Sequence, residues 1–239
     1  MPATLIESDR LPCREQGGRK VQKGEIYMKI QRPLRSMTAS LGVGLLLLAP
    51  SLPAQNGQPS SPLIGYEVVG QVLNSSAQQS LQYGYLNFVR GLDRITTSAG
   101  AAVSESTALF TFFNDTATER VINNGPIRVV DRTGTGAIYL GSGNATFANP
   151  DTFRVGTPVQ TFSLRHQVVI DTSTGYFTTT FEITITSVQT FQIDGKPHRL
   201  GHRGSAYRLN VSGKLAAPGP PSAYIAGAAD GGGDIMENE

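Results

Sequence analysis

The feature that most constrains this chain is an alternation of apolar and polar residues with a period of two, which runs through residues 64–215. Successive side chains of a β-strand point to opposite faces, so this alternation is typical of half-buried strands. A Thr-rich block at residues 172–190 adds β-branched residues, which favour strands over helices. The sequence therefore predicts an all-β domain over residues 64–215, without a substantial helix.

The register of one hairpin can be predicted. The loop at residues 172–175 ends in Gly175, a residue suited to the left-handed position of a tight turn. Pairing across this loop places the apolar positions of the two strands opposite one another: Ile170 with Phe177, His166 with Phe181, Leu164 with Ile183, and Phe162 with Ile185. The same register pairs Arg165 with Glu182 on the polar face, and a slip by one residue would expose the whole apolar set.

Two further signals follow this hairpin. The alternation changes parity after Ile185, which predicts a β-bulge near residues 186–187 that bends the strand. The dipeptide Asp194-Gly195 is a strong signal for a two-residue hairpin turn.

The number of strands limits the architecture. Turn-forming residues at 123–126 and 131–134 predict two more turns in the middle of the domain. The pattern as a whole gives about eight antiparallel strands joined in sequence. Long strands with a bulge favour a single β-barrel, and a two-sheet β-sandwich is the alternative.

Residues 28–54 have the three parts of a secretory signal peptide. Positively charged residues come first, an apolar run follows at residues 41–48, and Ala54 supplies the small residue before the cleavage point. The apolar run is too short to anchor the chain in a bilayer, which takes about 20 apolar residues. We therefore expect no transmembrane helix and predict that the protein is secreted or periplasmic.

The other segments outside the β domain are interpreted from composition. We interpret residues 1–27 as a non-native upstream extension of a bacterial gene, because residues 23–25 are what a purine-rich ribosome-binding site before Met28 would encode. A long but genuine leader is the alternative. Residues 55–63 are predicted to be a linker, and residues 216–239, rich in Gly, Pro and acidic groups, a disordered acidic tail.

Charge and cysteine content exclude several function classes. The formal net charge is +2, but the excess of basic residues lies in the first 54 residues, so it does not predict nucleic-acid binding. The single cysteine, Cys13, lies in the upstream extension, so neither thiol catalysis nor a Cys-ligated zinc is expected. No cofactor motif is recognisable, and we predict no cofactor.

The main candidate site is the interior of the barrel. His166 stands among apolar residues on the inward face of its strand, and we predict a ligand cavity lined by Tyr83, Tyr85, His166 and Phe181. His166 is also the one weak candidate for a catalytic group. The alternative is a core histidine whose ring nitrogens are satisfied by a backbone or hydroxyl group.

The densest cationic stretch of the β domain is a second, weaker candidate. It could bind an anion through five side chains: Lys196, His198, Arg199, His202 and Arg203. The two histidines have a spacing that joins metal ligands only on a helix, and no helix is predicted there, so no metal site is predicted. The alternative is a solvated loop.

These features together predict an exported bacterial β-barrel that binds a small apolar ligand or a component of the cell envelope. One alternative is a cyclase- or isomerase-like enzyme on the same scaffold, and another is an outer-membrane β-barrel. The sequence favours a function other than catalysis and does not predict the oligomeric state.

Overall fold

A computed structural model describes residues 63–232 of the chain. Ten strands and one short 3-10 helix are formed, in this order: β1 (Leu63–Asn74), β2 (Gln79–Val89), β3 (Phe110–Asn124), β4 (Ile127–Leu140), η1 (Pro150–Arg154), β5 (Thr157–Asp171), β6 (Tyr176–Val188), β7 (Phe191–Ile193), β8 (Lys196–His198), β9 (Ala206–Leu215) and β10 (Ala223–Gly232). Within these residues no helix is long and apolar enough to span a membrane. The predicted signal peptide and upstream extension lie outside the described residues, as does all of the predicted linker except Leu63.

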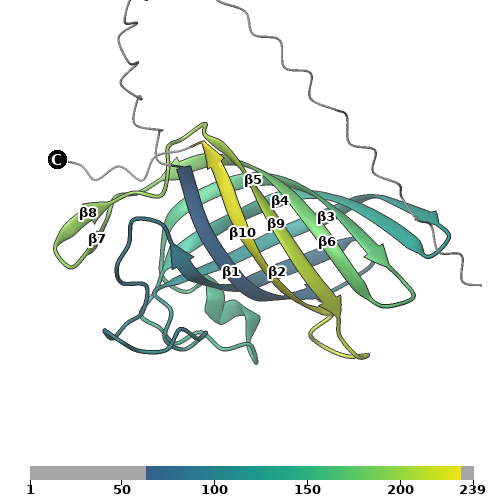
Figure 1. Ribbon diagram of the computed structural model, residues 1–239, viewed down its shortest axis with the longest axis horizontal. Coiled ribbons are helices and arrows are strands. Elements are labelled where there is room, and N and C mark those ends of the chain that lie inside the picture. Colours follow the sequence, from purple (N-terminus) through teal and green to yellow (C-terminus); the bar gives the residue numbers. More distant parts are fainter. Residues whose placement is uncertain (1–62, 233–239) are drawn as a thin grey trace, which may run out of the picture. The chain divides into compact units, whose positions relative to one another are not determined.

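Eight of the strands form a closed antiparallel barrel, so the prediction of a barrel is confirmed and the sandwich is not formed (Figure 1). The order around the barrel is β1-β10-β9-β6-β5-β4-β3-β2, in which each strand pairs with its neighbour along the chain once the β7–β8 hairpin is left out. Hairpin connections of this kind suit antiparallel strands, and closure leaves the barrel without a free edge.

The strand that closes the barrel is β10, and here the sequence prediction was wrong. Residues 223–232 were expected to be part of a disordered tail, but they pair with β1 on one side and with β9 on the other. The strand is rich in Ala and Gly, so it lacks the bulky alternation by which the other strands were identified. Its small residues serve close packing: a Cβ on Gly231 would lie 2.1 Å from the Cβ of Tyr207.

The predicted hairpin of residues 162–185 is confirmed in every pair. Ile170 opposes Phe177, and the remaining predicted pairs follow in the same register, including Arg165 with Glu182. The predicted bulge is present as well, since the register shifts so that Thr186 is skipped between Ile185 and Ser187. The Asp194-Gly195 turn joins β7 to β8 with φ angles of 50° and 78°, the positive values that such a turn requires.

The middle of the domain differs in part from the prediction. The turn at residues 123–126 is present, with Asn124 paired to Ile127 and with Gly125 at φ 58°. The turn expected at residues 131–134 is not formed, because these residues lie inside the long strand β4. Gly134 allows the backbones of β3 and β4 to approach closely, since a Cβ at this position would lie 2.0 Å from the carbonyl oxygen of Asp115 on β3.

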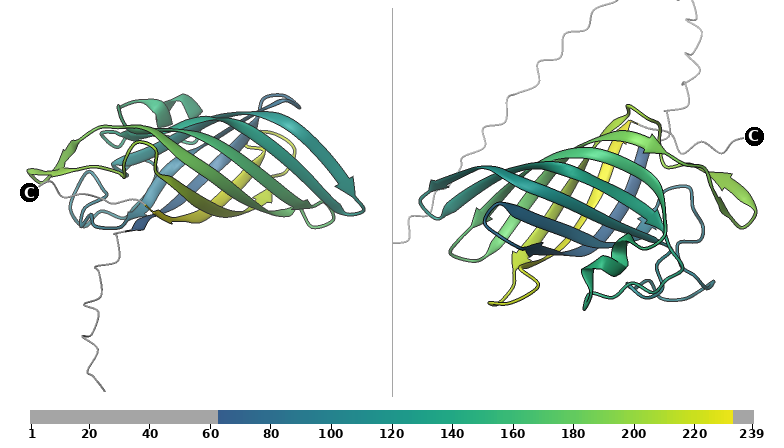
Figure 2. Two further views of the ribbon diagram at one scale, coloured as in Figure 1. Left: turned by 90° about the horizontal axis from the view of Figure 1, so that it is seen from above. Right: turned by 180° about the vertical axis from the view of Figure 1, so that it is seen from behind.

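The two ends of the barrel carry different connections (Figure 2). Long connections gather at one end, which we call the closed end: residues 90–109, 141–156 and 189–205. Short connections gather at the other, which we call the open end: residues 75–78, 125–126, 172–175 and 216–222. The β3–β4 hairpin projects beyond the other turns of the open end (Figure 2).

The closed end is filled by side chains. Tyr66 donates a hydrogen bond to the hydroxyl of Tyr207 (2.7 Å), and Tyr207 donates to Oε1 of Gln160 (2.8 Å). Nε2 of Gln160 in turn donates to the carbonyl of Leu200 (2.7 Å), which fastens the connection of residues 189–205 to the interior. These four residues are buried, and Phe110 packs edge-on against Phe191 beside them with ring centroids 5.4 Å apart.

Candidate functional site

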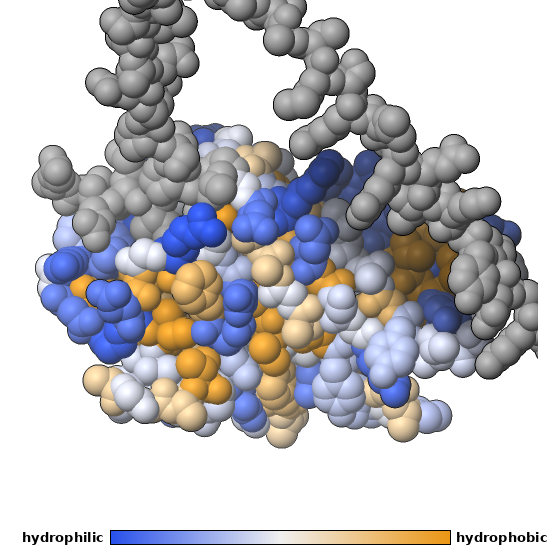
Figure 3. All heavy atoms as spheres, in the orientation of Figure 1, coloured by the Kyte–Doolittle hydropathy of each residue, from blue (hydrophilic) through white to orange (hydrophobic). Residues whose placement is uncertain are grey.

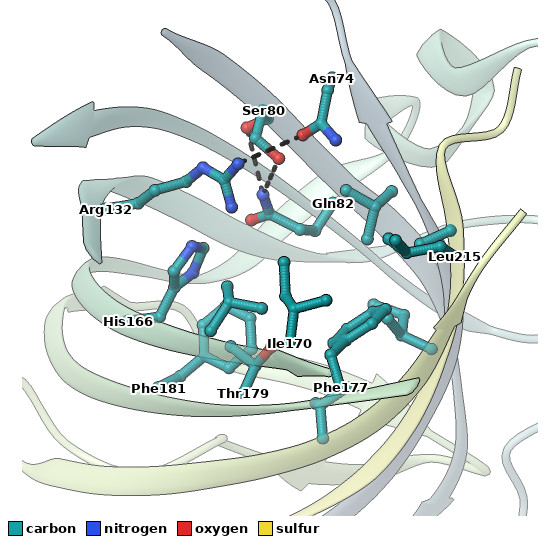
Figure 4. A pocket seen from close by; sticks show the side chains of 15 residues that line it. Asn74, Ser80, Gln82, Arg132, His166, Ile170, Phe177, Thr179, Phe181 and Leu215 are labelled. Atoms are coloured by element: carbon teal, nitrogen blue, oxygen red, sulfur yellow. Dashed lines mark hydrogen bonds between the residues drawn. The ribbon is translucent and has the colours of Figure 1, made fainter. Parts of the chain in front are cut away.

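A hollow enters the barrel at its open end (Figure 4). Its volume is about 470 Å³, which includes the solvent at its mouth. That is room for several water molecules or for a small ligand that extends towards the mouth. Fifteen residues line the hollow, and they come from every strand of the barrel except β3.

The hollow has two chemically different walls, which Figure 4 places opposite each other. The apolar wall comes mainly from β5, β6, β9 and β10: Val168, Ile170, Phe177, Phe181, Val211, Leu215, Ala223 and Ile225. The polar wall comes mainly from the start of β2, the end of β1 and the middle of β4: Asn74, Ser80, Gln82 and Arg132. His166 on β5 lies between the two walls.

His166 is buried at 2% exposure, with its ring edge-on to Phe181 at a centroid distance of 4.6 Å. Neither ring nitrogen has a hydrogen-bond partner among residues 63–232. Burial is the main cause that lowers the pKa of this imidazole to about 3, the charge of Arg132 contributes to the same shift, and the charge of Asp131 opposes it. His166 is therefore neutral near pH 7 and presents one N–H donor and one acceptor nitrogen.

The polar wall is held in place by a network around Gln82. Nε2 of Gln82 donates to Oγ of Ser80 (2.9 Å) and to Oγ1 of Thr116 (3.1 Å), and Thr116 donates to the carbonyl of Ser80 (2.9 Å). These contacts fix the amide with its oxygen free: Oε1 of Gln82 is buried and has no partner among the described residues. Gln82 thus offers the hollow a preoriented acceptor.

Arg132 supplies the charge of the site. It is the direct cross-strand partner of His166, so its side chain lies on the inward face of β4. Its Nε donates to Oγ1 of Thr118 (3.2 Å), and Nη2 lies 3.5 Å from Oδ1 of Asn74. Both acceptors are neutral. Desolvation and the neighbouring charge of Arg128 lower the pKa of the Arg132 guanidinium.

Only two of the four residues predicted to line the cavity do so. His166 and Phe181 line the hollow, whereas the prediction was wrong for Tyr83 and Tyr85. Both tyrosines belong to a second apolar cluster with Phe113, Phe147 and Phe153, in which Tyr83 lies 5.4 Å from Phe153. Because β2 has apolar residues on both faces, its pattern did not exclude the wrong choice of inward face.

Tertiary pairing decides the inward face of β2. Gln82 pairs with Asn114 of β3, and Gly84 pairs with Gly70 of β1 and with Phe112. A Cβ on Gly84 would lie 2.9 Å from the Phe112 ring, so the glycine leaves space for that ring inside the barrel. The alternate residues, including Tyr83, therefore face outward.

The predicted cationic site lies away from the hollow, on β8 and in the connection to β9. His198 is buried at 4% exposure and stacks on Phe191 at 5.9 Å. Lys196 and Arg203 are exposed, whereas Arg199 and His202 are half-buried. The five side chains thus occupy different environments, and anion binding there stays a prediction. Among the described residues no group of three or more His, Cys, Asp or Glu side chains could hold a metal ion.

Sequence reasoning missed the residues of the polar wall. Arg132 fell in a stretch expected to be a turn, and Ser80 and Gln82 fell on what was taken for the outward face of their strand. When polar and apolar residues alternate along a strand, the pattern does not show whether the polar residues point outward to solvent or inward into a hollow.

In comparisons with known proteins, no family model, no curated protein sequence and no solved structure matches this chain, so the assignment of its function rests on the geometry of the hollow.

Proposed function

We propose that the open end of this barrel binds a small ligand that is largely apolar. The observation that carries the proposal is the coexistence, in one hollow, of a continuous apolar wall with buried polar atoms that have no partner among residues 63–232. A buried polar group without a hydrogen bond costs roughly 1–3 kcal/mol, so natural proteins keep such groups mainly where a ligand or water completes them.

The rim of the hollow supports the same proposal. Five large apolar side chains that are more than two-fifths exposed lie near the turns of the open end: Val121, Ile122, Tyr176, Leu215 and Tyr224. Of these, Leu215 lines the hollow, whereas Tyr176 and Tyr224 lie on the outward face of their strands. Exposed apolar groups at this end favour the approach of a hydrophobic molecule. If the export signal predicted at residues 28–54 is used, the ligand comes from the cell envelope or from outside the cell.

Two alternatives are less well supported. A proton-transfer enzyme would need a base with a pKa near its working pH, and the pKa of His166, about 3, makes it a weak base.

An outer-membrane barrel would carry its apolar residues outside and its polar residues inside. Here the inward residues of β6 are buried and apolar except for Thr179, while most of the exposed outward ones are Thr and Glu side chains. Figure 3 shows polar residues interspersed among the apolar ones on one outer face.

Native mass spectrometry of the periplasmic protein tests the proposal. We expect the wild-type protein to retain a bound small molecule. Thr179→Phe places a ring in the hollow and should abolish the retained mass, because Thr179 lines the hollow and is buried. Thr180→Phe, on the outward face of the same strand, is the matched control and should keep it. An adduct that survives Thr179→Phe, or no adduct at all, would contradict the proposal.

A further inference from the structure

We propose that the hollow selects ligands with an anionic head group, and in particular monocarboxylates, with Arg132 binding the carboxylate and the apolar wall binding the hydrocarbon chain. This inference rests on the proposed function, that the hollow binds a ligand, and adds the chemical class of that ligand. It is carried by a cation inside the barrel that has no anionic partner among the described residues.

Arg132 has only neutral hydrogen-bond partners among the described residues. Its side chain contacts Thr118 and Asn74, both neutral, and it forms no ion pair with any residue of 63–232. Taking a guanidinium out of water is costly unless an anion compensates it. The planar fork of N–H donors matches a carboxylate, which it can bind through two parallel hydrogen bonds.

The acidic residues near Arg132 do not line the hollow. Asp131, next to Arg132 in β4, accepts hydrogen bonds from Arg120 (Nε, 2.8 Å) and from Gln167 (3.0 Å). Asp171, at the end of β5, accepts hydrogen bonds from the hydroxyl groups of Ser173 and Thr174. Neither carboxylate is left to neutralise Arg132.

Two further charged residues of this end lie close to β4 or within it, Glu119 and Arg128. Glu119 accepts a hydrogen bond from Thr133, on the outward face of β4. Arg128 pairs with Ile170, a residue that lines the hollow, but the Arg128 side chain is exposed and does not line the hollow itself. Arg132 within the hollow and Arg128 near its mouth are both cations, which favours an anion over a neutral or cationic ligand.

Two neutral side chains that can add hydrogen bonds to a ligand line the hollow together with Arg132. His166, its cross-strand partner, has a free N–H donor that can bind a carboxylate oxygen, and Oε1 of Gln82 can accept from a hydroxyl on the ligand. An inorganic anion would use the polar wall alone and leave the apolar wall without contact. A short carboxylic acid anion uses both walls.

Isothermal titration with hexanoate and with 1-hexanol, which have the same carbon count, separates charge from apolar contact. At pH 7 and low salt we expect wild-type protein to bind hexanoate about tenfold or more tightly than hexanol. Arg132→Met should remove that preference and leave hexanol binding unchanged. Arg165→Met is the matched control, because Arg165 is exposed on the outer face beside His166, and it should retain the preference for hexanoate.

Side-chain ¹⁵N NMR of the wild-type histidines gives a second measurement, which is independent of whether Arg132→Met folds. Hexanoate should shift the signals of His166 and leave those of His202, on the far connection, in place. Equal binding of hexanoate and hexanol, unaffected by Arg132→Met, would overturn the anionic class while leaving the hollow a ligand site. Binding of neither compound, with no shift of His166, would overturn both proposals.

Discussion

The closed and open ends of this barrel are built from the same eight strands and differ in what their inward side chains contact. At the closed end, the polar groups of Tyr66, Tyr207 and Gln160 form a hydrogen-bonded chain that ends on a carbonyl of the covering loop. At the open end, Gln82 and His166 are equally buried, but they retain atoms with no partner among residues 63–232.

The difference follows from the lengths of the connections. The end with long connections is suited to stabilising the barrel, and the end with short turns is left available for a ligand. The long connection of residues 189–205 supplies the carbonyl of Leu200 that completes the hydrogen-bonded chain inside the closed end, whereas tight turns cannot reach across the open end. Within that connection, Nδ1 of His198 and Nε of Arg199 are buried and have no partner among the described residues. We therefore expect the closed end to contribute most of the packing stability, and the open end to tolerate or even favour replacement of its polar groups. Four predictions test that division, from the largest effect to the smallest.

The largest expected difference is in packing. Phe110→Ala at the closed end should lower the free energy of unfolding by about 3–5 kcal/mol, because Phe110 is fully buried and its neighbours can collapse only partly. Phe177→Ala should cost less, since one side of that ring already faces the hollow. Urea denaturation of both variants measures the difference. Equal losses would mean that the two ends are packed alike.

The two ends should also respond to opposite extremes of pH. The pKa of His166 is about 3 in the folded protein and about 6.5 in the unfolded chain. Its contribution to the free energy of unfolding is therefore fully present above pH 6.5. That contribution is lost as pH falls towards 3, by up to about 1.4 kcal/mol per pH unit. Burial raises the pKa values of Tyr66 and Tyr207, so their contribution is present below about pH 10 and is lost as the pH rises further.

Urea denaturation across the pH range tests this second prediction. Between pH 4.5 and 6.5, before Asp131 titrates, His166→Phe should have a flatter stability profile than wild-type protein. An identical slope in the two proteins would show that His166 is not the group that titrates. On the alkaline side, Tyr207→Phe should reduce the loss of stability that wild-type protein suffers.

Removing a hydrogen-bonding group should change the stability of the protein in opposite directions at the two ends. Tyr207→Phe leaves the hydroxyl of Tyr66 and Oε1 of Gln160 without the partner between them, at a cost of about 1–3 kcal/mol. His166→Phe removes no hydrogen bond to residues 63–232 and fills an apolar neighbourhood, so it should be neutral or stabilising. Melting temperatures decide the sign, and a destabilised His166→Phe would mean that the imidazole is satisfied in the folded protein.

The smallest expected effects concern one ion pair at each end. Arg94 and Asp194 join the first long connection to the β7–β8 turn, with side chains 29% and 60% exposed, so Arg94→Ala should cost less than about 1 kcal/mol. Arg120→Ala at the open end should cost more, because the Asp131 side chain is only 4% exposed and would keep Gln167 alone as a partner. Urea denaturation in low and high salt measures both, and the opposite ranking would contradict the prediction.

The sequence predicted much of the fold where neighbouring segments determine each other. The 162–185 hairpin has alternation on both strands, a Gly-terminated loop and a charge pair, and these signals agree on a single register. The bulge at Thr186 and the Asp194-Gly195 turn are equally local. His166 and Phe181 were placed in the cavity for the same reason, since they are partners in that hairpin.

Only the tertiary structure decided which strand closes the barrel and what lines the hollow. The Ala- and Gly-rich strand β10 is recognisable as a strand only because β1 and β9 pair with it, from positions that are distant or weakly marked in the sequence. Likewise Arg132 faces inward, and Tyr83 outward, because of pairings across β1, β2, β3 and β4. Alternation along one strand fixes which residues share a face, but the choice of the inward face is made by the strands on either side.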